Sequence, residues 1–306
     1  MFSLEKKYHT SNKYSGSDWN YEETTKYVFS FDLGYVEAGY FIHYLESENG
    51  IIEKKHVIEL PSSYGCPMKC AFCASSLISN VKPLSSNEIY KIFYYIYENN
   101  HLTENKSLLV SMKGIGDLYF TIDSVLGAIK QMASVNKKIT FSVSSCYWTY
   151  DMLKKVENMS TEVLFRSIQF TYVSYDNDVL KNIIKFYESR TYDIDMISSM
   201  ITKSKLHQFK INYIMIEGVN DSEKDFEIFI SKLKKIRQKI VIRISKMNVT
   251  ESSKMNKLNG TTINKMMDFK KQLKDEGFNV YLFYSYKDDQ MNCGQLIMNK
   301  KIEETL

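Results

Sequence analysis

Apolar residues in this chain follow two periods that alternate from about residue 55 onward. Short runs rich in Val, Ile and Phe are typical of buried strands. Longer segments between them repeat apolar residues at intervals of three and four, as on one face of a helix. Each predicted helix is marked by a capping residue at its start or a glycine at its end. These marks are the capping box at 85–88, Thr121, Asp221 or Ser222, Thr261 or Thr262, and Gly277.

Six predicted strands alternate with these helices. They cover residues 55–60, 107–112, 138–144, 166–171, 210–215 and 239–244, and a final strand is expected at 279–284. Right-handed crossovers place such strands in one parallel sheet, and six units are too few to close the eight-fold barrel. The pattern therefore predicts an α/β fold, a partial (β/α)6 barrel, with its chemistry at the C-terminal ends of the strands.

The beginning of the chain has a different pattern. The first two dozen residues are polar and aperiodic, so we expect an arm or a short helix there. Segments 27–33 and 36–44 carry β-branched and aromatic residues on either side of Gly34 and predict an antiparallel hairpin. Three parts follow from this pattern: an N-terminal arm and β-hairpin at 1–54, the barrel at 55–278, and a C-terminal strand with an active-site tail at 279–306.

Composition narrows the class of protein. With 306 residues, of which 44% are hydrophobic, the chain can bury a large core. Lys and Arg number 40 against 36 Asp and Glu, a net charge of +4, so composition gives no strong signal for a polyanionic partner. No apolar run has the length of a secretion signal or approaches the ~18 residues of a membrane span. We expect a cytoplasmic protein with no membrane partner.

Three of the five cysteines lie within eight positions, in a C-x3-C-x2-C pattern directly after the first strand of the predicted barrel. Such close neighbours are poorly placed for a disulfide framework and indicate a metal site. Cys66, Cys70 and Cys73 can hold three corners of a [4Fe-4S] cluster and leave the fourth iron for an outside ligand. A structural zinc site is the alternative, but it requires a fourth Cys or His, and none lies near this loop.

Residues 66–73, CPMKCAFC, resemble the motif of the radical S-adenosylmethionine (SAM) superfamily. The resemblance implies that SAM binds the open iron through its amino and carboxylate groups. It also implies that an electron from the reduced cluster breaks the S–C5′ bond of SAM, giving a 5′-deoxyadenosyl radical. In such enzymes the cofactor supplies the difficult chemistry, and the protein supplies placement and exclusion of water.

Further segments resemble one branch of that superfamily, the RlmN/Cfr-type methyl synthases that act on adenine in RNA. The matching segments are Ser62-Ser63, residues 114–117, 141–145 and 213–221, and the Cys-Gly-Gln-Leu at 293–296. By this resemblance a set of residues is expected to contact SAM. The set comprises Gly114, Gly116, Asp117, Ser142, Ser144, Thr171 and Asn248.

Cys293 is, by the same resemblance, a methyl carrier: its thiolate takes CH3 from one SAM, and the radical from a second SAM removes a hydrogen from the S-methyl group. The alternative interpretation of Cys293 is that it serves only as a small apolar side chain in a C-terminal hairpin. The family's second catalytic cysteine is replaced here by Leu60. Cys146, after the third strand of the predicted barrel, is the remaining thiol and a candidate replacement, and a buried thiol without a catalytic role is its alternative.

The sequence therefore predicts a radical SAM C-methyltransferase that acts on an sp2 carbon. Its substrate is RNA adenine or, since the family's N-terminal RNA-binding domain has no counterpart in this sequence, a small molecule or peptide. A reductase such as flavodoxin or ferredoxin is the expected electron donor. Two alternatives stay open: a radical SAM enzyme that abstracts hydrogen without methyl transfer, and a non-catalytic iron–sulfur protein.

Overall fold

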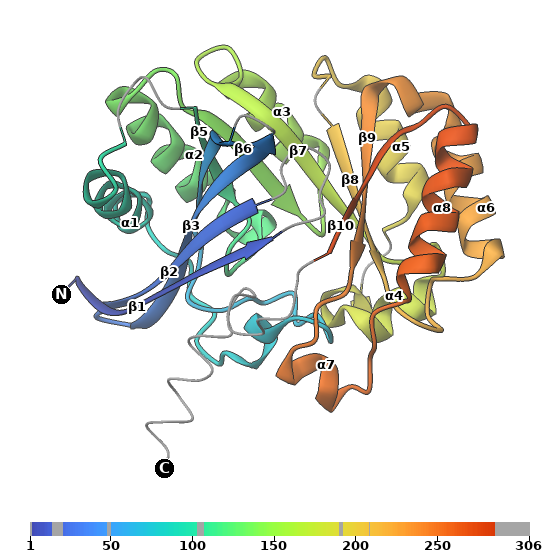
Figure 1. The fold of residues 1–306 in the computed structure, drawn as a ribbon. Helices are drawn as coiled ribbons and strands as arrows, with labels where there is room; N and C mark the ends of the chain where they lie inside the picture. Colours follow the sequence, from blue (N-terminus) through green and yellow to red (C-terminus); the bar gives the residue numbers. More distant parts are fainter. Residues whose placement is uncertain are drawn as a thin grey trace.

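One continuous sheet organises the computed structural model, which describes residues 2–13, 21–47, 50–102, 107–189, 192–207 and 209–284. Its ten strands lie side by side in the order in which they occur along the chain, as Figure 1 shows. The strands are β1 (Ser3–Lys13), β2 (Tyr21–Phe31), β3 (Gly34–Ser47), β4 (Gly50–Glu59), β5 (Leu108–Met112), β6 (Thr140–Ser145), β7 (Leu164–Tyr172), β8 (Phe209–Met215), β9 (Ile240–Lys246) and β10 (Asn279–Phe283).

The first four strands are antiparallel. The predicted hairpin around Gly34 is confirmed as β2 and β3, with Phe31 opposite Gly34 across the turn. The expected arm or short helix at the N-terminus is wrong, because residues 3–13 form strand β1 along β2. Its polar composition gives no hydrophobic alternation, but the edge of β2 offers a full ladder of backbone hydrogen bonds. Phe2 also stacks on Phe29, with the ring centroids 5.2 Å apart.

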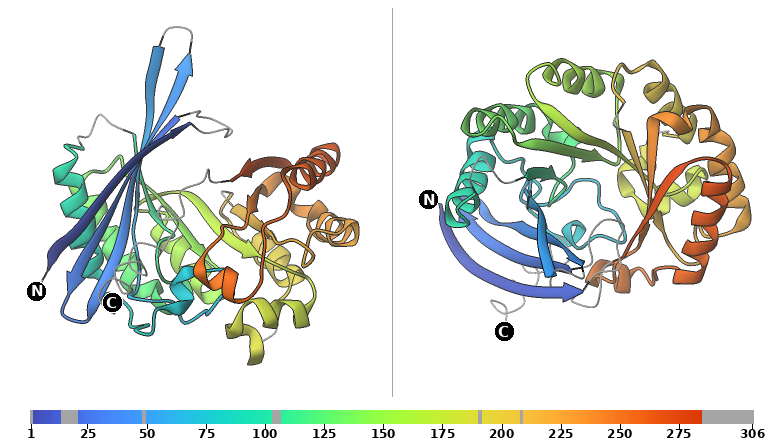
Figure 2. Two further views of the ribbon diagram at one scale, coloured as in Figure 1. Left: turned by 60° about the horizontal axis from the view of Figure 1, so that its bottom comes forward. Right: turned by 45° about the horizontal axis from the view of Figure 1, so that its top comes forward.

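Strands β4 to β10 are parallel and form the partial barrel. The six strands predicted from the sequence are confirmed as β4 to β9, and the final predicted strand is β10, which pairs in parallel with β9. The helices lie outside the curved sheet and surround its parallel part (Figure 2). They are α1 (Ser86–Asn99), α2 (Leu118–Val135), α3 (Tyr150–Met159), α4 (Asn177–Ile183), α5 (Ile194–Lys203), α6 (Glu223–Leu233), α7 (Glu251–Met255) and α8 (Ile263–Asp275).

Capping residues fix most helix starts where the sequence places them. Ser85 caps α1, with Glu88 closing the capping box through its 2.8 Å bond from the Ser85 amide. Ser222 caps α6 and Thr262 caps α8. The predicted cap at Thr121 is wrong: the cap of α2 is Asp117, four residues earlier, whose carboxylate accepts a hydrogen bond from the Tyr119 amide at 2.9 Å.

The main apolar core lies between the outer face of the sheet and the helices. Side chains such as Phe93, Ile129, Phe141 and Phe229 are fully buried there. The inner face of the parallel strands carries many polar side chains instead, as the lining of the barrel. Within the described part of the chain, no helix combines the length and the hydropathy that crossing a bilayer requires.

Candidate active site

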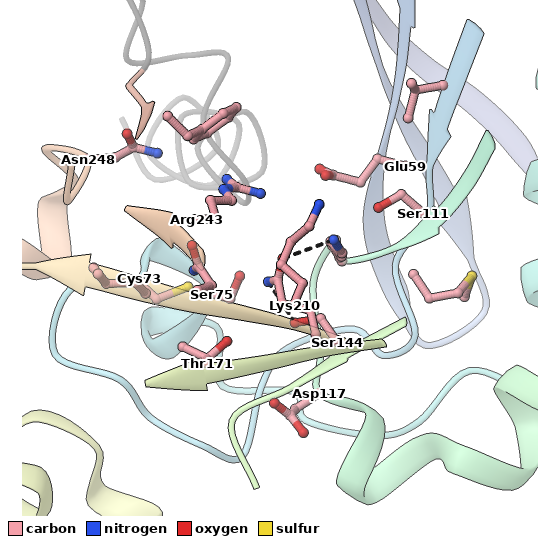
Figure 3. Close-up of a pocket in the computed structure, with 18 of the residues that line it drawn as sticks. Glu59, Cys73, Ser75, Ser111, Asp117, Ser144, Thr171, Lys210, Arg243 and Asn248 are labelled. Carbon is pink, nitrogen blue, oxygen red and sulfur yellow. Dashed lines mark hydrogen bonds between the residues drawn. The ribbon is translucent and has the colours of Figure 1, made fainter. Parts of the chain in front are cut away.

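A cavity of about 470 Å³ lies inside the partial barrel. Its lining comes from β2 to β5 on one side, from β6 to β10 on the other, and from the loop that carries the three clustered cysteines. Figure 3 shows side chains from these separate elements pointing into the same space, with Cys73, Asp117, Lys210 and Asn248 among them. The barrel therefore brings together residues that are far apart in the sequence.

The cysteine loop follows β4 and is held against the loop after β5 by backbone bonds. The Leu60 amide donates to the Ser111 carbonyl at 2.9 Å, and the Gly114 amide donates back to the Leu60 carbonyl at 3.1 Å. The Ser62 amide then donates to the Ile115 carbonyl at 2.8 Å. The pairing of β4 and β5 is thus extended beyond the strands and fixes where the cysteine loop begins.

Glycines make this close approach of two backbones sterically feasible. A Cβ on Gly114 would lie 2.7 Å from the Leu60 carbonyl oxygen. Gly116 has a φ of +111°, and a Cβ there would lie 2.5 Å from the Ser63 hydroxyl oxygen. Both distances are far inside van der Waals contact, and the positive φ also favours glycine. Gly114 and Gly116 line the cavity as well, so their missing side chains keep that wall open to a ligand.

Asp117 joins three parts of the site. Its carboxylate is buried and accepts bonds from the Ser145 hydroxyl at 2.5 Å, the Cys146 amide at 2.8 Å and the Tyr119 amide. Burial raises the pKa of Asp117 to about 6, against the lowering effect of these hydrogen bonds. The end of β6 and the start of α2 are therefore tied together by a carboxylate that faces the cavity.

The three clustered cysteines, Cys66, Cys70 and Cys73, all line the cavity. Burial raises the pKa of the Cys66 and Cys73 thiols. The pKa of Cys70 is raised by a hydrogen bond with the Cys146 thiol and by burial. Cys146, predicted as a candidate second thiol, thus lies beside the cluster loop.

The structure also places the other predicted SAM contacts. Ser144, Thr171 and Asn248 line the cavity, and the Ser144 hydroxyl accepts from the Gln169 amide at 3.0 Å. Ser142 is not among the lining residues: it lies one pleat further from the end of β6, where its hydroxyl bonds to that of Ser167 at 2.5 Å. Cys293 lies outside the described residues.

Sequence reasoning missed the charged residues on the inner face of the barrel. Lys113, Lys210 and Arg243 line the cavity. The signal that could have found them is their position: Lys210 lies between buried Phe209 and Ile211, so it points to the opposite face of the strand. Arg243 is placed in the same way on β9.

No protein-family model matches the chain. A probable dual-specificity RNA methyltransferase RlmN from Cytophaga hutchinsonii is 28% identical over 295 residues, 90% of this chain and 73% of that protein. One from Chlorobium chlorochromatii is 26% identical over 268 residues, 81% of this chain and 68% of that protein.

The crystal structure of a radical SAM methyltransferase from Sphaerobacter thermophilus matches with a TM-score of 0.74 at 14% identity, over 96% of this chain and 80% of that one. Streptococcus suis SuiB bound to SAM matches with a TM-score of 0.52 at 13% identity, over 76% and 51%. These similarities support a divergent radical SAM enzyme of the RlmN/Cfr type.

The cofactors of a radical SAM enzyme are a [4Fe-4S] cluster and SAM, and the residues of the cavity fit them. Three thiols with no His or carboxylate among them are the donor set of an iron–sulfur cluster. They are near enough to one another to raise each other's pKa. Among the described residues no three His, Cys, Asp or Glu side chains converge as a group that could hold a single metal ion. The family favours this interpretation over the zinc site and over a non-catalytic protein.

The contact between the two loops gives a testable stability difference. Gly116 and Gly50 have nearly the same φ, +111° and +110°, but a Cβ on Gly50 meets nothing within 4 Å. We expect Gly50→Ala to lower the free energy of unfolding by about 1–2 kcal/mol through its backbone conformation alone. Gly116→Ala adds overpacking against the Ser-Ser pair, about 1–3 kcal/mol more. Urea unfolding measures both, and equal losses would contradict the tight packing of this loop.

Proposed function

We propose that this enzyme cleaves SAM reductively and transfers a methyl group to an sp2 carbon of an adenine-like ring, with Cys293 as the methyl carrier. The observation that carries the proposal is that three cysteines, a glycine loop and a buried carboxylate share one cavity inside a radical SAM barrel. The Cys-Gly-Gln-Leu segment supports the branch. Its first residue, Cys293, comes ten positions after Phe283 in the sequence. Phe283 ends β10 and lines the cavity.

Cys66, Cys70 and Cys73 are the residues that would hold the cluster. When bound, the cluster supplies the electron that breaks the S–C5′ bond of SAM and yields a 5′-deoxyadenosyl radical. The Asp117 carboxylate would accept a hydrogen bond from the SAM amino group. Gly114 and Gly116 would let the backbone of their loop approach SAM closely. Cys66, Cys70 and Asp117 are buried, which limits the access of water to these groups and would protect a radical from side reactions.

Cys293 would carry the transferred carbon. As a thiolate it is a nucleophile strong enough to accept the methyl group of one SAM molecule, releasing S-adenosylhomocysteine. As S-methylcysteine it would then give up one hydrogen atom, so that its carbon can add to an electrophilic sp2 carbon. An sp2 carbon of this kind is not a nucleophile, so direct methyl transfer from SAM does not reach it.

The names of the relatives bear on the substrate. They are described as RNA methyltransferases, so RNA is one candidate acceptor and a small molecule or peptide is the other. A reductase such as flavodoxin or ferredoxin would reduce the cluster.

Two cysteine variants test the assignment of roles. Anaerobically reconstituted wild-type enzyme with SAM and dithionite is expected to form 5′-deoxyadenosine and to carry an S-methyl group on Cys293. Cys293→Ala should keep 5′-deoxyadenosine formation and lose the methylated peptide, since only the carrier is removed. Cys66→Ala should lose cluster iron and 5′-deoxyadenosine together. Mass spectrometry and chromatography measure both products, and a wild-type protein with no methyl on Cys293 would remove the carrier role.

Cys146 is our candidate for the thiol that releases the product. Its amide donates a hydrogen bond to the Asp117 carboxylate and its thiol is hydrogen-bonded with that of Cys70, so it lies at the cavity beside the cluster loop. Leu60 occupies the position of the family's second catalytic cysteine and cannot perform this step. We expect Cys146→Ala to form 5′-deoxyadenosine and to accumulate a covalent adduct between Cys293 and substrate, seen as a mass increase of the protein. Product release at the wild-type rate would exclude Cys146 from the mechanism.

Asp117 makes SAM binding depend on pH. Its pKa is raised to about 6, so the carboxylate that would hold the SAM ammonium group is charged above that pH and neutral below it. SAM affinity is therefore expected to rise between pH 5 and 7, by up to about tenfold per unit below the pKa. Asp117→Asn should bind SAM more weakly and lose this pH dependence. Asp123→Asn, exposed on the same helix, should behave as wild type. Equilibrium dialysis with labelled SAM measures both, and a pH dependence retained in Asp117→Asn would contradict the role.

A further inference from the structure

Three cations from separate elements line one region of the cavity. Lys113 follows β5, Lys210 lies on β8 and Arg243 lies on β9. Figure 3 shows Lys210 and Arg243 pointing into the same space, with Glu59 across from them. We refer to Lys113, Lys210 and Arg243 together as the cationic triad. None of the three forms an ion pair with a carboxylate of the described chain; Lys113 donates to Gln169 at 3.0 Å and Arg243 to Ser245 at 3.0 Å.

The triad is electrostatically unfavourable in the absence of an anion. Burial lowers the pKa of Lys113 well below its usual range, and the charges of Lys210 and Arg243 lower it further. Glu59 acts in the opposite direction on Lys113, but this carboxylate already lies 3.7 Å from Lys26. Like charges placed together with little solvent repel one another, and one added anion would relieve the repulsion for all three.

Aromatic rings hold two of these cations in place without neutralising them. The Arg243 guanidinium lies 3.6 Å from the centroid of the Phe283 ring, and the Lys210 ammonium lies 5.2 Å from that of Tyr281. A ring face attracts a cation through its quadrupole and carries no net charge. A guanidinium fixed in this way keeps its planar set of donors, which matches a phosphate or a carboxylate.

We propose that the acceptor substrate of this enzyme is a small molecule that carries a phosphate or carboxylate group, and that the cationic triad binds this group inside the barrel. The inference rests on the proposed function and names the class of its substrate. The triad lines the same cavity as the cluster loop and Asp117, so an anion held there would lie in the space that the cofactors share. The triad lies on the inner face of the strands, and its charge complements an anion that enters the cavity.

Titration calorimetry on the reconstituted, SAM-saturated enzyme tests the proposal with inorganic phosphate, adenosine 5′-monophosphate, adenosine and benzoate. We expect an anionic probe to bind. Preference for the two phosphates identifies a phosphate site, and preference for benzoate a carboxylate site. Lys210→Met should weaken binding of the preferred anion by about 10- to 100-fold, as the loss of a charged hydrogen-bonding partner does. Lys224→Met, an exposed lysine on α6, is the matched control and should bind as wild type.

A second readout separates ligand binding from a structural role. Without ligand, Lys210→Met should unfold at a higher temperature than wild type, because it removes one of three repelling charges. A structural lysine would give the opposite shift. Three results would overturn the proposal. They are that no anion binds the wild-type enzyme, that Lys210→Met binds the anion as tightly as wild type, or that Lys210→Met loses affinity for SAM and not for the anion. Binding of an RNA hairpin that Lys210→Met leaves unchanged would also overturn it. Wild-type formation of 5′-deoxyadenosine is measured in parallel, so failure of the anion site is distinguished from failure of the proposed function.

Discussion

The backbone contact between the ends of β4 and β5 is the constraint on which the rest of the site depends. Beyond the strands, the Leu60 amide donates to the Ser111 carbonyl and the Leu60 carbonyl accepts from the Gly114 amide. The next bond, from the Ser62 amide to the Ile115 carbonyl, sets the path of the chain toward Cys66. Because a Cβ at Gly114 would overlap the Leu60 carbonyl, this arrangement requires glycine. The cysteine loop, the glycine loop and the start of α2 therefore have fixed positions relative to one another before any cofactor binds.

Asp117 shows what this arrangement costs in stability. Since its pKa is raised from 3.8 to about 6, its contribution to stability is fully present below the unfolded value and is lost as the pH rises through about 6. The ionised carboxylate is tolerated because three donors face it, two of them backbone amides. A group that is charged and buried at neutral pH is typical of a site selected for binding and not for stability.

Much of this architecture could be predicted from the sequence, because the signals are local. Buried parallel strands are continuous apolar runs, and Ser85, Ser222 and Thr262 are strong caps. The failures have physical causes. Strand β1 is held by pairing with β2, which its own composition does not show, and Asp117 outcompetes Thr121 as a cap. The cationic triad was missed because each member, taken alone in the sequence, resembles an ordinary surface charge. Only the folded sheet brings the three side chains into one cavity. The expected contact of Ser142 with SAM stays a prediction; its hydroxyl bonds to that of Ser167, and the β6–β7 register that brings the two together shifts at that point.

The N-terminal strands belong to the cavity as well as to the sheet, and they help to interpret its charges. Lys26 on β2 faces Glu37 at 3.2 Å, and both side chains are almost fully buried, at 3% and 2% exposure. Lys26 is thus a buried cation whose charge is balanced by a carboxylate of the protein itself, as a purely structural buried charge requires. The cationic triad lies in the same cavity, has no such partner among the described residues, and is held by two aromatic rings, the Gln169 amide and the Ser245 hydroxyl. That contrast within one cavity is the reason to assign the triad to a ligand anion and Lys26 to the fold.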